Sequence, residues 1–339
     1  MHIRYIAYTL FLFIAAIGFA LEIPYPEVSF APSMGIVYGN SKEFVYADNS
    51  KISELVWPLT PVYLLDLETQ VMWNEKLAIL VDDSIGVPRA SGTLTDTDFL
   101  NVAVNGNTEK TDYSEHDAQL NQMLLVTLNA SWAYHLQVRG IASTTAITVT
   151  PSIGFRYFSI KWTGYDGYGQ YTYGHSAWSE TIPKTIFKGR IIEYSQRYLA
   201  PQAGLKVTIP IGNHFAVTSG FIGSPSVWCD GIDNHETTKT DYFDSLSRGI
   251  FLEPNVRIHW YSGQTLSVFA DCEWTHIFNL RGRTEKNDRI THATTLYEEE
   301  NGGGAEYTAW TMKVGIKKTF SPGNANSASE KANNYSLKN

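Results

Sequence analysis

The chain has 339 residues, with 26 basic and 34 acidic side chains and a formal net charge of -8 at pH 7. This acidic balance argues against nucleic acid as a partner, since the phosphate backbone is bound by basic surfaces. The two cysteines, Cys229 and Cys272, are too few and too widely spaced for a disulfide framework or a zinc motif. They are left as one disulfide or two idle thiols. No linker rich in Pro, Gly or Ser divides the middle of the chain, so we expect one large domain.

The first 20 residues have the pattern of a secretory signal peptide. Arg4 gives a basic start, residues 5–19 are apolar, and Ala20 supplies the small residue expected at a cleavage site. A transmembrane anchor is the alternative, but the run is short for a span and no basic stop-transfer flank follows it. We therefore expect residues 1–20 to be a signal peptide that directs export.

Beyond this segment the hydrophobic period is two, which is typical of β-strands. Apolar side chains occupy every second position of residues 124–134, and polar residues such as Thr127 lie between them. The alternation recurs over residues 266–274, where Phe269 breaks it, and over residues 310–316. Segments of about ten residues or more have the length needed to cross a bilayer at a tilt. Alternation by itself fits either a soluble secreted β-sandwich, with apolar faces in a core, or a membrane barrel, with its apolar face in lipid.

Aromatic content and turn spacing favour the barrel. The chain contains 20 Tyr, 16 Phe and 9 Trp, and membrane barrels carry rings of Tyr and Trp at both lipid interfaces. Tight turns are predicted at residues 210–213 and 261–264. The long polar segments, expected to be extracellular loops, are residues 93–118, 163–190, 229–246 and 282–304. We therefore expect an all-β, antiparallel transmembrane β-barrel over residues 21–320, followed by a disordered tail at residues 321–339.

Three polar clusters lie where a predicted strand meets a long loop. Each contains side chains spaced i, i+2, which places both on one face of a strand. These pairs are Asp96 with Asp98, Ser114 with His116, and Asp233 with His235. A carboxylate beside an imidazole fixes its tautomer and raises its basicity, whereas two close carboxylates share a proton. The set therefore fits hydrolysis by an activated water, although such spacings also occur in solvated loops and cation sites.

Two sequence blocks resemble a known family. Residues 35–46 (GIVYGNSKEFVY) and 51–57 (KISELVW) are similar to the first hairpin of the omptins, and residues 194–198 (YSQRY) and 200–205 (APQAGL) are similar to a second omptin block. The order of motifs agrees over nearly the whole mature chain. The resemblance implies a monomeric, ten-stranded barrel in the outer membrane of a diderm bacterium, acting as an aspartic-type endopeptidase on peptides or proteins. Its active site would face outside, and it implies no metal and no other cofactor.

Carried over by position, the resemblance assigns roles to the polar clusters. The family's catalytic residues fall on Asp96, Asp98, Asp233 and His235. Its supporting residues fall on Asp112, Ser114 and His116. The implied mechanism has His235 as general base, oriented by its aspartate, while the aspartate pair holds the attacking water. One residue of the family pattern is missing after His116.

The resemblance also implies cleavage next to Arg or Lys through an acidic specificity pocket. One pocket acid matches Glu43, whose alternative interpretation is a solvated charge in a hairpin. The other falls on Gly231, with Asp230 immediately before it. We therefore expect Glu43 and Asp230 to bind the basic side chain of the substrate, with less strict specificity than two matching acids give.

Omptins need lipopolysaccharide on the outer wall of the barrel, so the resemblance implies this lipid as an activator and outer-membrane lipid as a partner. Arg197 matches one of its contacts, since a guanidinium suits a phosphate. The strand around Phe155, Tyr157 and Ser159 lacks the expected arginine, and Arg197 fits an ion pair inside the lumen equally well. A barrel that kept this scaffold without activity, as an adhesin or a porin, is the rival function. The presence of all four catalytic residues argues against it.

Overall fold

The computed structural model describes residues 26–101, 109–139, 144–263, 265–297 and 300–321, so the predicted signal peptide and nearly all of the predicted tail lie outside the described residues. The elements in chain order are β1 (Glu27–Ala47), β2 (Ser50–Trp73), β3 (Leu77–Gly86), β4 (Arg89–Asp98), β5 (Asp112–Trp132), β6 (Tyr134–Arg139), β7 (Thr144–Gln170), the 3-10 turn η1 (Tyr173–His175), β8 (Thr185–Ile186), β9 (Arg190–Ile211), β10 (Phe215–His235), β11 (Thr240–Tyr261), β12 (Leu266–Asp288), β13 (Thr294–Tyr297) and β14 (Gly303–Phe320). Within these described ranges, no helix is long and apolar enough to span a membrane.

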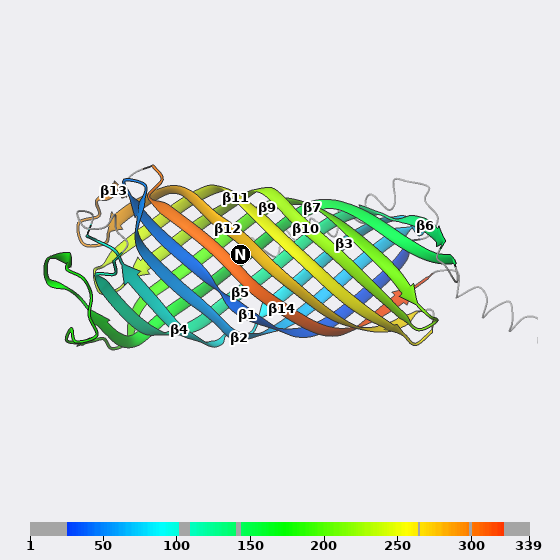
Figure 1. Ribbon diagram of the computed structural model, residues 1–339, viewed down its shortest axis with the longest axis horizontal. Coiled ribbons are helices and arrows are strands. Elements are labelled where there is room, and N and C mark those ends of the chain that lie inside the picture. The colour runs from blue at the N-terminus through cyan, green and yellow to red at the C-terminus, as the bar shows by residue number, and fades with distance from the viewer. Residues whose placement is uncertain (1–25, 102–108, 140–143, 264, 298–299, 322–339) are drawn as a thin grey trace, which may run out of the picture.

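The strands form one antiparallel sheet that closes on itself, as Figure 1 shows. β1 pairs with β2 along one edge and with β14 along the other, where Val28 stands opposite Phe320 and Val45 opposite Gly303. β3 and β4 both pair with β2 on one side and with β5 on the other. They therefore count as a single strand of the barrel, interrupted between Gly86 and Arg89. The ring therefore contains about ten strands, which confirms the predicted antiparallel barrel.

The burial pattern of the strands is that of a barrel with an apolar outside and a polar inside. On β5, Thr127 is 4% exposed while Trp132 is 44% exposed. On β14, Lys313 is 4% exposed while Val314, next to it, is 57% exposed. A soluble sandwich would bury the apolar face instead, so the structure supports the membrane alternative. Phe269, which breaks the alternation on β12, is buried on the inner face.

An exposed apolar band surrounds the wall and stops short of one end. On β1 the band reaches from Phe30, in edge contact with Phe320, to Tyr38, which is paired in register with Trp310. Beyond this level the wall continues to Ala47. A band rimmed by aromatic side chains is the part that contacts lipid. The upper end of the barrel, which carries Ala47 and β13 and lies at the left of Figure 1, therefore rises above the membrane.

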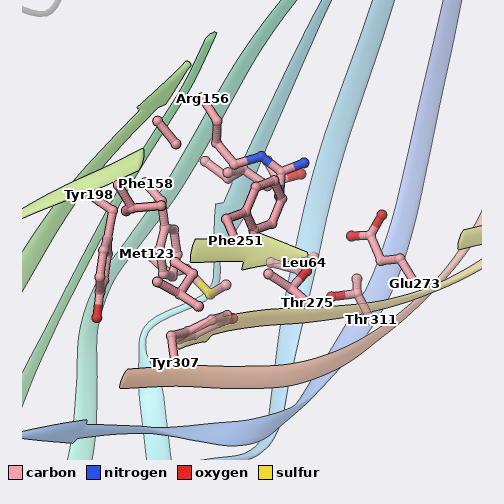
Figure 2. A pocket seen from close by; sticks show the side chains of 15 residues that line it. Leu64, Met123, Arg156, Phe158, Tyr198, Phe251, Glu273, Thr275, Tyr307 and Thr311 are labelled. Carbon is pink, nitrogen blue, oxygen red and sulfur yellow. The ribbon is translucent and has the colours of Figure 1, made fainter. Parts of the chain in front are cut away.

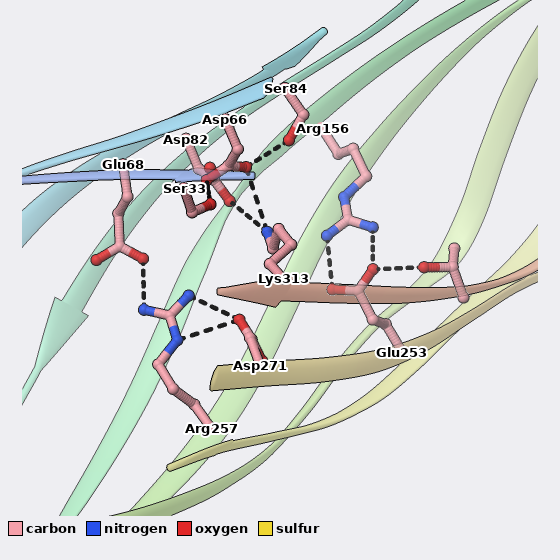
Figure 3. A network of polar contacts seen from close by, with 11 residues as sticks. Ser33, Asp66, Glu68, Asp82, Ser84, Arg156, Glu253, Arg257, Asp271 and Lys313 are labelled. Carbon is pink, nitrogen blue, oxygen red and sulfur yellow. Dashed lines mark hydrogen bonds and ion pairs between the residues drawn. The ribbon is translucent and has the colours of Figure 1, made fainter. Parts of the chain in front are cut away.

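At the level of the band, ion pairs line the lumen (Figure 3). Arg257 of β11 bridges Glu68 of β2 and Asp271 of β12, with a nitrogen–oxygen distance of 2.8 Å to each. Nζ of Lys313 on β14 lies 3.2 Å from the Asp66 carboxylate of β2. Charges in a region of low dielectric require such partners. The pairs connect β2 to β11 and β14 across the inside of the barrel.

Above the ion pairs, large apolar side chains close the lumen. Trp57 stacks on Tyr194 with ring centroids 5.5 Å apart and contacts Trp162 at 5.8 Å, and all three are fully buried. Figure 2 shows a small cavity of the lumen, about 30 Å³ in volume, which is bordered by Phe158 and Tyr307. At the level of the ion pairs the lumen keeps a cavity of about 220 Å³. The aromatic layer above it closes the interior, unlike the open channel of a large barrel, which argues against the porin alternative.

The strands run further toward the upper end than the sequence pattern indicated. Residues 93–98 belong to β4, β5 already starts at Asp112, and β10 continues to His235, although all three lie in segments predicted to be long loops. Above the membrane neither face of a strand needs to be apolar, so the alternation disappears while the hydrogen-bonded ladder continues. The tight turns that join β9 to β10 and β11 to β12 lie at the opposite end, as predicted.

Candidate active site

The four predicted catalytic side chains come together at the upper mouth of the barrel. Asp233 and His235 share one face of β10, and Nε2 of His235 lies 2.5 Å from Oδ2 of Asp233. Asp96 and Asp98 lie on β4, beside Ser53 of β2, whose hydroxyl donates to Asp96 over 3.3 Å. The i, i+2 spacing explains each pair, and closure of the barrel brings the two pairs into one site.

The charges of the two pairs act on each other. Burial alone would lower the pKa of His235, but the carboxylate of Asp233, and after it those of Asp96 and Asp98, raise it above its ordinary value. Burial raises the pKa of Asp98 to about 6. Burial, and then the charge of Asp98, holds the pKa of Asp96 well above its usual range. The two carboxyl groups therefore hold a proton more tightly than isolated aspartates do, and a shared proton lets such a pair both donate and accept hydrogen bonds.

The three predicted supporting residues line β5, next to the aspartate pair. Asp112 stands opposite Asp98 in the β4–β5 register, and Ser114 lies on the same face. Nε2 of His116 is 3.1 Å from the Ser114 hydroxyl, and its Nδ1 is 2.6 Å from the backbone carbonyl of Asp166. Because a carbonyl only accepts, Nδ1 carries the hydrogen and Nε2 accepts from Ser114. Burial lowers the pKa of His116, which favours the neutral imidazole.

The segment that follows β7 closes one side of the site. The backbone N–H of Thr172 donates to Oδ1 of Asp112 over 2.7 Å, which fixes the start of this segment. The adjacent Tyr171 has a pKa raised to about 12 by burial and then by the charges of Asp96 and Asp98. Sequence reasoning missed Ser53 and Tyr171, since only the folded barrel brings them to the aspartates: Ser53 by the pairing of β2 with β4, and Tyr171 by the hydrogen bond of its neighbour Thr172 to Asp112. No pattern in the chain signals their position.

Of the two predicted substrate-binding acids, only Glu43 lies in the mouth. Glu43 points inward from β1 and is 4% exposed, so it is not a solvated hairpin charge. Burial, followed by the charge of Asp233, raises its pKa. Asp230 is exposed on the outer wall, opposite Arg197 in the β9–β10 register. Because side chains alternate along a strand, Gly231 faces the lumen and Asp230 faces away, and the prediction that Asp230 joins Glu43 in a pocket is wrong.

Arg197, the predicted lipid contact, also lies on the outside. Its side chain is exposed, whereas its neighbours Gln196 and Tyr198 are buried on the inner face of β9. The alternative interpretation, an ion pair inside the lumen, is therefore wrong. In the part of the chain that the structure describes, no group of three or more His, Cys, Asp or Glu side chains is placed to hold a metal ion.

Comparison with known proteins gives one family and one close fold. The sequence model of the Omptin family matches residues 25–320. The outer membrane protease OmpT from Escherichia coli is similar over 88% of this chain and 99% of its own, with 20% sequence identity and a TM-score of 0.79. At this identity the likeness shows the fold alone. No curated protein matches the chain in sequence.

Two other solved barrels are more distant. The match to the transport unit of the autotransporter AIDA-I from Escherichia coli covers 87% of this chain and 90% of that structure, with 12% sequence identity and a TM-score of 0.36. The outer membrane protein OprG from Pseudomonas aeruginosa covers 87% and 96%, with 9% identity and a TM-score of 0.32. Scores this low carry no argument about the chain.

Proposed function

The chain belongs to the omptin family and is thus an outer-membrane protease. We propose that it is an endopeptidase that cleaves peptide bonds next to basic residues, and that its active site, at the upper mouth of the barrel, faces the outside of the cell. The observation that carries the proposal is the contact of 2.5 Å between His235 and Asp233. Asp96 and Asp98 are close enough to raise the pKa of that histidine. This combination supplies a general base, a carboxylate that orients the base, and a second pair of carboxyl groups that can bind the attacking water.

The proposed reaction is direct attack by water on the scissile carbonyl. His235 takes a proton from the water as the C–O bond forms, and Asp233 holds the imidazole and stabilises its positive charge. When the tetrahedral intermediate collapses, the C–N bond breaks and the imidazolium of His235 returns the proton to the leaving amine. Asp96 and Asp98 bind the water from the other side, and the proton they share donates a hydrogen bond to the oxyanion. No metal or other cofactor takes part in this mechanism. The alternative function is a barrel without activity. The meeting of the Asp233–His235 pair and the Asp96–Asp98 pair in one mouth argues against this alternative.

The proposal is tested with a randomised peptide library, using the barrel refolded in detergent with and without lipopolysaccharide. We expect cuts that fall mainly beside Arg or Lys, because the inward carboxylate of Glu43 attracts a cationic side chain. Mass spectrometry of the products gives the residues on both sides of each cut. Cuts beside neutral residues alone would remove the basic preference, and no cuts in either condition would favour the non-catalytic barrel.

Activation by lipopolysaccharide is part of the same proposal. Arg197 is exposed on the outer wall and presents a guanidinium, which binds a phosphate with paired hydrogen bonds. The library experiment repeated with Arg197→Ala tests this contact. Activation that is unchanged in this variant would remove Arg197 from the proposed lipid site.

The pH dependence of cleavage follows from the pKa of His235. Only the neutral imidazole accepts a proton, and the surrounding carboxylates raise its pKa, so it becomes neutral at a higher pH than usual. We therefore expect kcat/KM to increase with pH around a midpoint above about 6.5, the ordinary value for histidine. A pH profile with a single peptide measures it. A midpoint at or below about 6.5 would contradict the assignment of His235 as the base.

A further inference from the structure

Three buried carboxylates from different strands meet in the mouth, and one of them belongs to the catalytic pair. They are Glu43 of β1, Asp233 of β10 and Asp244 of β11, and each is at most 5% exposed. Burial and then the charges of Asp233 and Asp244 raise the pKa of Glu43, and burial raises that of Asp244 to about 7. Within the described part of the chain, neither Glu43 nor Asp244 forms an ion pair, and Oε2 of Glu43 is buried without a hydrogen-bond partner. Buried acids without a basic partner are costly, and a cation that enters from outside relieves them.

Asp244 occupies the space in front of a glycine. It stands opposite Gly231 in the β10–β11 register, and a Cβ added to Gly231 would lie 2.8 Å from Oδ2 of Asp244. The hydroxyl of Thr284 on β12 donates to Oδ1 of Asp244 over 2.5 Å and so fixes the carboxyl group. A carboxylate is therefore held over the inner face of β10 at position 231, although that position has no side chain.

We propose that Asp244, together with Glu43, forms the pocket that receives the Arg or Lys side chain of the substrate. The acid is supplied by β11, and Gly231 provides the room for it. A guanidinium or ammonium entering here meets carboxylates from two sides of the mouth, next to the residues that attack the peptide bond. The inference rests on the proposed peptidase function and deepens it, because it names the residue that sets specificity.

The test compares two peptides that differ at one position, the residue whose side chain enters the proposed pocket. One peptide has arginine there, and the other has citrulline, its neutral isostere. The wild-type barrel should prefer arginine, and Asp244→Asn should reduce the arginine-to-citrulline ratio of kcat/KM by about 10- to 100-fold, as expected when a buried charge loses its partner. Cleavage of the citrulline peptide should change little. Asp230→Asn is the matched control, since it removes an equal charge from the residue beside Gly231 but on the outer wall, and it should leave the ratio unchanged.

A second variant moves the acid back to β10. Gly231→Asp alone crowds a new side chain against Asp244, because the first added carbon already lies too close to its carboxylate. Gly231→Asp combined with Asp244→Gly removes the clash, and we expect this double variant to regain the preference for arginine that Asp244→Gly alone has lost. The double variant also shows that Asp244 acts through its charge in the pocket and not through folding.

The outcomes separate the two proposals. A wild-type barrel that prefers arginine while Asp244→Asn keeps the full ratio would overturn the role of Asp244 and leave the peptidase intact. An equal loss with both peptides would also overturn it, since that is the signature of a structural role. Wild-type protein that cleaves neither peptide, nor any member of the library, would overturn the peptidase function itself.

Discussion

We expect the His235→Ala barrel to cleave peptides about 10²- to 10⁴-fold more slowly than the wild type, the usual contribution of a general base. The reason is that the other two imidazoles near the aspartate pair have different partners. His116 contacts Ser114 and the carbonyl of Asp166, and Nδ1 of His175 lies 3.6 Å from the carboxylate of Asp112. The measurement is kcat with a single peptide at the pH optimum of the wild type.

The control for this variant is His276→Ala. His276 lies on the outer wall of β12, stacked on Trp274, so its loss removes an imidazole without touching the mouth. It should cleave at the wild-type rate. Thermal unfolding in detergent shows whether both variants form the barrel. A folded His235→Ala protein with normal turnover would remove His235 from the mechanism.

The barrel was predictable because its wall repeats one physical rule many times. Polar and apolar residues alternate on β5 and β14, and the length of these runs indicates a membrane crossing. The direction of the alternation was not contained in the pattern, since Thr127 faces inward in a barrel but outward in a sandwich. Phe269 could not be placed either, because an apolar side chain fits the lumen wherever packing requires one.

The catalytic pairs were predictable for a local reason, and the specificity pocket was not. Spacing i, i+2 places Asp233 and His235 on one face of a strand whatever the rest of the fold does. The pocket depends on the register between β10 and β11, which alone reveals that Asp244 stands opposite Gly231. Sequence proximity suggested Asp230 instead, but one step along a strand turns a side chain to the other face of the wall.

The largest effect on stability is expected from Lys313→Met. The ammonium of Lys313 lies 3.2 Å from Asp66 and 4.0 Å from Asp82 and is 4% exposed, at the level of the lipid band. Methionine has a similar length but no charge, so these carboxylates lose their shared partner inside the lumen. Breaking a buried ion pair in this way costs about 3–5 kcal/mol of the free energy of unfolding. Denaturant unfolding of the barrel in detergent measures the loss.

The control is Lys318→Met, the same change on the same strand at an exposed position, which should alter stability by no more than about 0.5 kcal/mol. Adding Asp66→Asn to Lys313→Met should recover part of the loss, because it removes one of the stranded charges. Equal stabilities for the two lysine variants would contradict this account.

The stacked Trp57 and Tyr194 separate the ion pairs from the mouth, so Lys313→Met protein that is still folded should cleave peptides at the wild-type rate. A barrel that loses stability but keeps its activity would show that the lumen charges hold the wall together while the mouth performs the chemistry.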